Sequence, residues 1–187
     1  MTNRLLFMHR PEEGTAQAMV GLTDLLKRGY ALTGKPFPPD RLHSTLQNLG
    51  DYSDLSPALV AAARRAAAIV AVPPVEVAFD RVMTFSGGPG NRPLVLRGGA
   101  GVVPLQRAIG KAMAKVGLGA FVNRSFTPHI TLLRGDGVVE EQAVETFCWT
   151  VREFVLVNSL VGQGKYVELG RWSLGGDHLV PQAWRRP

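Results

Sequence analysis

Residues 42–46 read Leu-His-Ser-Thr-Leu and residues 128–132 read Pro-His-Ile-Thr-Leu, so the motif His-x-Thr-Leu occurs twice. The two histidines lie 86 positions apart (129 − 43), one in each half of the 187-residue chain. Both copies fall in segments with the short apolar pattern of a β-strand. The repeat therefore predicts two similar halves, each of which contributes one motif.

Strand geometry gives the spacing a physical meaning. Side chains alternate across a strand, so residues i and i+2 share a face. His43 and Thr45 therefore point the same way, and so do His129 and Thr131. Ser44 faces the opposite side. Two such strands, brought together by a pseudo-symmetric fold, would direct two imidazoles and two hydroxyls into one cleft.

That set of groups suits phosphoryl chemistry. An imidazole with a pKa of about 6.5 is available in both protonation states near neutral pH, so one ring can accept a proton while the other donates one. Threonine hydroxyls can donate hydrogen bonds to phosphate oxygens, where charge develops in the transition state. This design needs no metal and no cofactor.

Outside the motifs, the chain reads as short strands and helices in mixed order, which predicts an α+β protein. No segment looks like a linker, so we expect one domain over residues 1–187. We expect strands at 4–9, 42–49, 75–85, 93–97, 130–134, 153–160 and 166–174, and helices at 14–28, 57–69 and 102–116.

Composition narrows the protein class. Hydrophobic residues make up 45% and charged residues 19%, which is typical of a packed globular protein. The apolar runs are too short to cross a bilayer, and the N-terminus lacks a signal-peptide pattern. With a single cysteine, Cys148, we expect a cytoplasmic monomer without membrane contact, and we expect that thiol to be buried. The net charge of +6 favours anionic ligands such as nucleic acid or nucleotides.

The motifs in their context resemble a known family. Residues 41–50 and 126–134, together with the closing stretch 154–159, Tyr166 and Trp172, are similar to the RNA 2′,3′-cyclic phosphodiesterases, or 2′-5′ RNA ligases, of the two-histidine (2H) phosphoesterase superfamily. The resemblance implies two pseudo-symmetric lobes whose antiparallel sheets flank a central groove, with helices on the outside. It also implies hydrolysis of RNA 2′,3′-cyclic phosphate ends to 2′-phosphomonoesters, with weak 2′-5′ ligation as the reverse reaction.

The resemblance also implies roles for individual residues. His129 would be the general base and His43 the general acid, while Thr45 and Thr131 would hold the phosphate. Arg134 would add a cationic contact, although its odd offset from His129 predicts the opposite face of the strand. The residues alone leave the two histidine roles interchangeable.

Other interpretations stay open at this point. The same chemistry would serve a small cyclic nucleotide or an ADP-ribose cyclic phosphate, and a non-catalytic RNA-binding module is a third alternative. Phe37, Phe126 and Tyr166 are candidates for stacking on a base. His9 is expected at the surface. Residues 185–186, both arginine, form the one tight basic cluster, which we expect to be a solvated tail.

Overall fold

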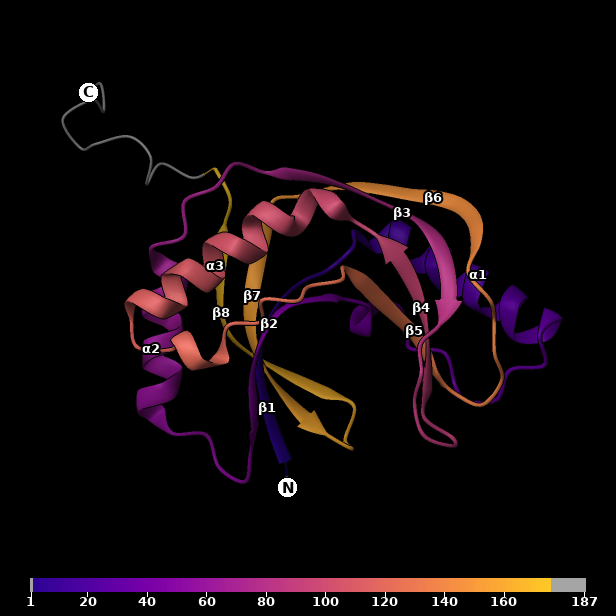
Figure 1. Ribbon diagram of the computed structural model, residues 1–187, viewed down its shortest axis with the longest axis horizontal. Helices are drawn as coiled ribbons and strands as arrows, with labels where there is room; N and C mark the ends of the chain where they lie inside the picture. The colour runs from indigo at the N-terminus through magenta and orange to yellow at the C-terminus, as the bar shows by residue number, and fades with distance from the viewer. Residues whose placement is uncertain (1, 176–187) are drawn as a thin grey trace.

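The computed structural model describes residues 2–175, so the arginine pair at 185–186 and the last residues of the predicted domain lie outside it. The described chain forms two antiparallel four-stranded sheets, ordered β2-β1-β7-β8 and β5-β4-β3-β6 (Figure 1). The predicted α+β class with two lobes is confirmed. The strands are β1 (Thr2–His9), β2 (Ser44–Tyr52), β3 (Val75–Thr84), β4 (Arg92–Gly98), β5 (His129–Gly135), β6 (Gln142–Val151), β7 (Glu153–Val161) and β8 (Lys165–Ser173). The helices are α1 (Glu13–Gly29), α2 (Pro57–Ala68) and α3 (Val103–Lys115).

The two sheets place the repeated motifs in equivalent positions. Strand β2 is the edge of the first sheet and β5 is the edge of the second, and each pairs with the next strand inward, β1 or β4. The two edge strands lie beside each other. Helices α2 and α3 pack against the first sheet, whereas α1 contacts β5 and β6 of the second (Figure 1). Because α1 directly follows β1, the chain crosses between the lobes early and ties them together.

Alternating burial along the strands builds one main core. Leu5 and Phe7 of β1 and Leu94 and Leu96 of β4 are at most 1% exposed, and they belong to a single apolar cluster. Each such side chain contributes about 1.5–3 kcal/mol when it leaves water. The other face of β1 supplies a smaller cluster with β7, against which Tyr166 packs. That second cluster lies next to the groove described below.

Helix α3 shows the predicted amphipathic pattern. Leu105, Ile109 and Met113 recur every four residues and are fully buried, which holds α3 against the first sheet. The opposite face carries Arg107 and Lys111, which are exposed. No helix within residues 2–175 has the length and apolar character needed to cross a membrane.

Three sequence predictions are wrong. No strand is expected between residues 134 and 153, yet β6 lies there. Only the second half of β6 alternates clearly, with Phe147, Trp149 and Val151 buried. Cys148 sits between these inward residues and is therefore exposed instead of buried. His9 shares the inward face of β1, so it is 1% exposed and not a surface residue, and its ring lies 5.9 Å from that of Trp149.

Candidate active site

A cavity of about 340 Å³ lies between the lobes, and all five predicted site residues line it. They are His43, Thr45, His129, Thr131 and Arg134. Thr45 lies on β2 and His43 directly precedes that strand, whereas the other three residues lie on β5. Residues far apart in sequence thus meet in one groove.

The two histidines are anchored in the same way. The Nδ1–H of His43 donates to the carbonyl of Arg41, and that of His129 donates to the carbonyl of Thr127, both at 2.8 Å. Each acceptor lies two residues before its histidine, so the two arrangements are related by the 86-residue repeat. A carbonyl can only accept, which fixes the tautomer and leaves Nε2 of each neutral ring as the free, basic nitrogen.

Burial along β2 explains why the serine in the first motif is tolerated. Leu42, Ser44 and Leu46 are at most 1% exposed, while His43 and Thr45 are partly exposed and line the groove. Ser44 therefore faces the interior, as predicted, and the apolar side of the strand holds the motif in place.

A β-bulge brings Arg134 into the groove. Leu94 pairs with Leu133 and the next residue of β4, Val95, pairs with Thr131, so Leu132 is an extra residue in β5. Leu132 and Leu133 are both buried, which breaks the alternation and returns Arg134 to the face of Thr131. The bulge is therefore the physical reason why Arg134 lines the groove together with Thr131 despite its odd offset from His129.

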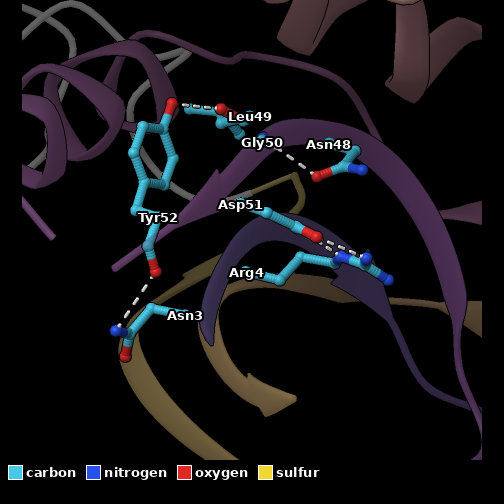
Figure 2. Close-up of polar contacts among 7 residues, drawn as sticks. All are labelled: Asn3, Arg4, Asn48, Leu49, Gly50, Asp51 and Tyr52. Carbon is cyan, nitrogen blue, oxygen red and sulfur yellow. Dashed lines mark hydrogen bonds and ion pairs between the residues drawn. The ribbon is translucent and has the colours of Figure 1, made fainter. Parts of the chain in front are cut away.

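The first motif contains the same bulge. Phe7 pairs with Gln47 and Met8 pairs with Thr45, so Leu46 is the extra residue. As a result Asn48, which is 86 positions before Arg134, also lines the groove. Its side-chain oxygen accepts the backbone N–H of Gly50 at 3.0 Å (Figure 2).

Two further arginines line the groove. Arg4 of β1 is held by the carboxylate of Asp51, with nitrogen–oxygen distances of 2.6 and 2.7 Å (Figure 2). The guanidinium of Arg41 lies between two aromatic rings, 5.0 Å from the centroid of Phe37 and 5.4 Å from that of Tyr166. Arg41 was within reach of sequence reasoning, because it lies only two residues before His43, at the end of a short 3-10 helix (Pro39–Arg41). Arg4 was not, because only the sheet order brings β1 beside the motif.

Two of the three aromatic residues proposed to stack on a base lie in the groove, and the third does not. Phe37 and Tyr166 line the groove, whereas Phe126 lines neighbouring cavities. The Tyr166 ring meets the His43 ring edge-on at 5.4 Å, and Phe85 meets the His129 ring edge-on at 5.1 Å. Each catalytic candidate is thus flanked by an aromatic side chain that restricts its rotation.

The electrostatics of His43 are those of a desolvated ring among cations. Burial lowers the pKa of His43 to about 4. The hydrogen bond to the Arg41 carbonyl opposes this change, while the charges of Arg10 and Arg41 and the nearby His129 add to it. His43 is therefore neutral at pH 7 when the groove is empty.

The groove is built for an anion. Three guanidinium groups line it, those of Arg4, Arg41 and Arg134, and no carboxylate does so among the described residues. Within residues 2–175 no group of three or more His, Cys, Asp or Glu side chains is placed to hold a metal ion. Two oriented imidazoles, two hydroxyls and three cations can bind a phosphate and move protons on either side of it.

Comparisons with known proteins agree with this arrangement. A model of the 2′-5′ RNA ligase superfamily matches residues 14–163. A comparison with curated proteins finds no match.

Solved structures share the whole fold. The protein TT0787 of Thermus thermophilus is 24% identical with a TM-score of 0.71, covering 94% of this chain and 100% of its own. E. coli LigT in its apo form is 26% identical with a TM-score of 0.65, and the match covers 92% of this chain and 98% of LigT. LigT in complex with ATP is 24% identical with a TM-score of 0.68, covering 93% and 99%.

Proposed function

The chain belongs to the 2′-5′ RNA ligase superfamily of two-histidine phosphoesterases, and we propose that it hydrolyses RNA 2′,3′-cyclic phosphate ends to 2′-phosphomonoesters. One observation carries the proposal: two imidazoles, each with Nδ1 fixed by its own backbone and Nε2 free, line one cationic groove. E. coli LigT has been crystallised with ATP and with 3′-AMP, which supports a nucleotide-type ligand here.

In the proposed reaction, water attacks phosphorus opposite the 3′ oxygen. Nε2 of His129 takes a proton from the water as the new P–O bond forms. Nε2 of His43 gives its proton to the 3′ oxygen as the P–O3′ bond breaks. The phosphate stays on the 2′ oxygen. Thr45 and Thr131 donate hydrogen bonds to the non-bridging oxygens, and Arg134 balances their negative charge.

The acid role requires His43 to carry a proton that it lacks in the empty groove. Burial and the arginine charges hold its pKa near 4. A bound cyclic phosphate brings one negative charge beside the ring, and an opposite charge at such a distance raises an imidazole pKa. We therefore propose that His43 takes up its proton together with the substrate.

The test is a hydrolysis assay on an oligonucleotide that ends in a 2′,3′-cyclic phosphate, with the product phosphate located by ³¹P NMR. His43→Ala and His129→Ala should each lower kcat by at least about 10²-fold, the usual contribution of one acid or base, while circular dichroism stays unchanged. Ser44→Ala is the matched control, because this residue lies in the same motif but faces the core. Near-normal turnover in either histidine variant would refute the mechanism.

The same assay separates the other interpretations. Faster turnover of a mononucleotide or of ADP-ribose cyclic phosphate than of the oligonucleotide would favour a small-molecule substrate. RNA binding without any turnover would favour a binding module.

A further inference from the structure

A second cavity, of about 530 Å³, lies along the outer face of α3. We call it the α3 cavity; its lining includes Arg107, Lys111, Gly110, Arg124 and Phe126. Arg107 and Lys111 are four residues apart and exposed, so both lie on the same side of the helix. Neither takes part in the ion pairs found among the described residues. The proposed hydrolysis makes no use of these cations.

A smaller cavity of about 230 Å³ lies between the α3 cavity and the catalytic groove, and we call it the connecting cavity. Thr45, Asn48 and His129 line both the connecting cavity and the groove. Gln47 and Phe126 line both the connecting cavity and the α3 cavity. The three cavities are therefore adjacent, each sharing wall residues with the next, and we call this series the path.

The wall of this path is fixed by buried amides. Gln47 is 1% exposed; its oxygen accepts the backbone N–H of Asn123 at 2.9 Å. Gln106 is 4% exposed and donates to the carbonyl of Asn123 at 2.9 Å. Both backbone groups of Asn123 are thus held by side chains from β2 and α3. The same segment continues to Thr127, which anchors the His129 ring. The path is a preformed surface attached to the catalytic base.

The unpaired charges along the path have one sign. Arg41 and Arg134 in the groove and Arg107, Lys111 and Arg124 in the α3 cavity form no ion pair among the described residues, whereas Arg4 is paired with Asp51. Among the described residues, no Asp or Glu lines any of the three cavities. A positively charged channel with an aromatic ring along it is the usual construction for a single-stranded nucleic acid, because phosphates meet the cations and bases stack on the ring.

We propose that the α3 cavity binds the nucleotides on the 5′ side of the terminal cyclic phosphate. This inference rests on the proposed function for what occupies the groove. The RNA leaves the groove past Asn48, crosses Phe126, and meets Arg107, Lys111 and Arg124 with its phosphates. A mononucleotide fills only the groove and gains nothing from the α3 cavity.

The experiment compares kcat/KM for cytidine 2′,3′-cyclic monophosphate and for a hexanucleotide ending in a 2′,3′-cyclic phosphate. The variant is Arg107→Glu/Lys111→Glu. The control is Arg28→Glu/Arg65→Glu, which has the same net charge and changes two exposed arginines that line none of the three cavities. We expect the wild type to prefer the hexanucleotide by at least tenfold, and the variant to lose most of that preference while keeping its mononucleotide rate. The salt dependence of hexanucleotide KM should also fall by about 1.4 in log–log slope, for two lost phosphate contacts.

Equal kcat/KM for the two substrates in the wild type would overturn the inference. An equal effect of the variant and the control would also overturn it. If no cyclic phosphate is hydrolysed at all, the proposed function fails instead. The α3 cavity is then tested by fluorescence anisotropy with a labelled hexanucleotide carrying a 2′-phosphate. Binding weakened at least tenfold by Arg107→Glu/Lys111→Glu but not by the control supports the inference, and unchanged binding overturns it.

Discussion

Acidification is expected to destabilise this protein through His9. The side chain is 1% exposed, and neither ring nitrogen has a hydrogen-bond partner among the described residues. Burial, with a smaller effect of the nearby His43, lowers the pKa of His9 from 6.5 to about 3. Between these pH values the folded chain binds fewer protons at His9 than the unfolded chain does. The titration of His9 therefore has no effect on the free energy of unfolding above about pH 6.5. Below that pH, the free energy of unfolding decreases as the pH falls.

The magnitude follows from the same pKa values. At pH 4.5 the solution lies two pH units below the unfolded-state pKa of 6.5 and still above the folded-state pKa. Each unit is worth about 1.36 kcal/mol, so His9 alone should remove about 3 kcal/mol of the free energy of unfolding between pH 7 and pH 4.5. His43, whose pKa is also lowered by burial, adds a loss of its own.

Urea unfolding followed by tryptophan fluorescence at both pH values provides the assay. His9→Phe removes the ionisable group and keeps an aromatic ring beside Trp149, and His9→Gln is a second variant that cannot ionise in this range. The losses from other groups are common to all three proteins and cancel in the comparison. Both variants should lose about 3 kcal/mol less than the wild type on acidification, whatever their stability at pH 7. An equal loss in all three proteins would refute the reasoning.

Three further predictions concern the first motif, the groove and the reaction. Ser44→Ala should raise the free energy of unfolding, measured by urea titration, by about 1 kcal/mol and leave kcat/KM unchanged. The reason is that the serine hydroxyl is buried and has no hydrogen-bond partner among the described residues. A lower stability of the variant would contradict this. Arg134→Ala should raise KM for a cyclic phosphate about tenfold, as expected for the loss of one charge-assisted hydrogen bond. Asn48→Ala should raise KM less. An unchanged KM for the arginine variant would place Arg134 outside the site. Chelation with EDTA should leave the rate unchanged, because the proposed reaction moves its protons with two histidines and uses no metal ion. A loss of rate restored by a divalent cation would contradict it.

The alternation of side chains along a strand was sufficient to predict that each motif's histidine and threonine share a face, because alternation depends only on spacing in the sequence. It was insufficient for Arg134, because the bulge at Leu132 arises from pairing with β4 and from a bond that Phe37 donates to the Leu132 carbonyl at 2.8 Å. Both partners are distant in sequence. Arg4 was missed for the same reason: its place in the groove depends on sheet order, not on its neighbours along the chain.

The two motifs are alike in backbone and unlike in surroundings, and this difference bears on the division of labour between the histidines. Both rings bond the carbonyl two residues back at 2.8 Å, and both strands bulge three residues after the histidine, so geometry alone treats them equally. At His43, burial lowers the pKa, and the charges of Arg10 and Arg41 add to this effect. A ring that is neutral in the empty groove and surrounded by cations gains a proton most readily when an anion arrives. That coupling ties the acid form of His43 to the presence of substrate, so proton uptake on binding, measured in weakly buffered solution near pH 7, should disappear in His43→Ala.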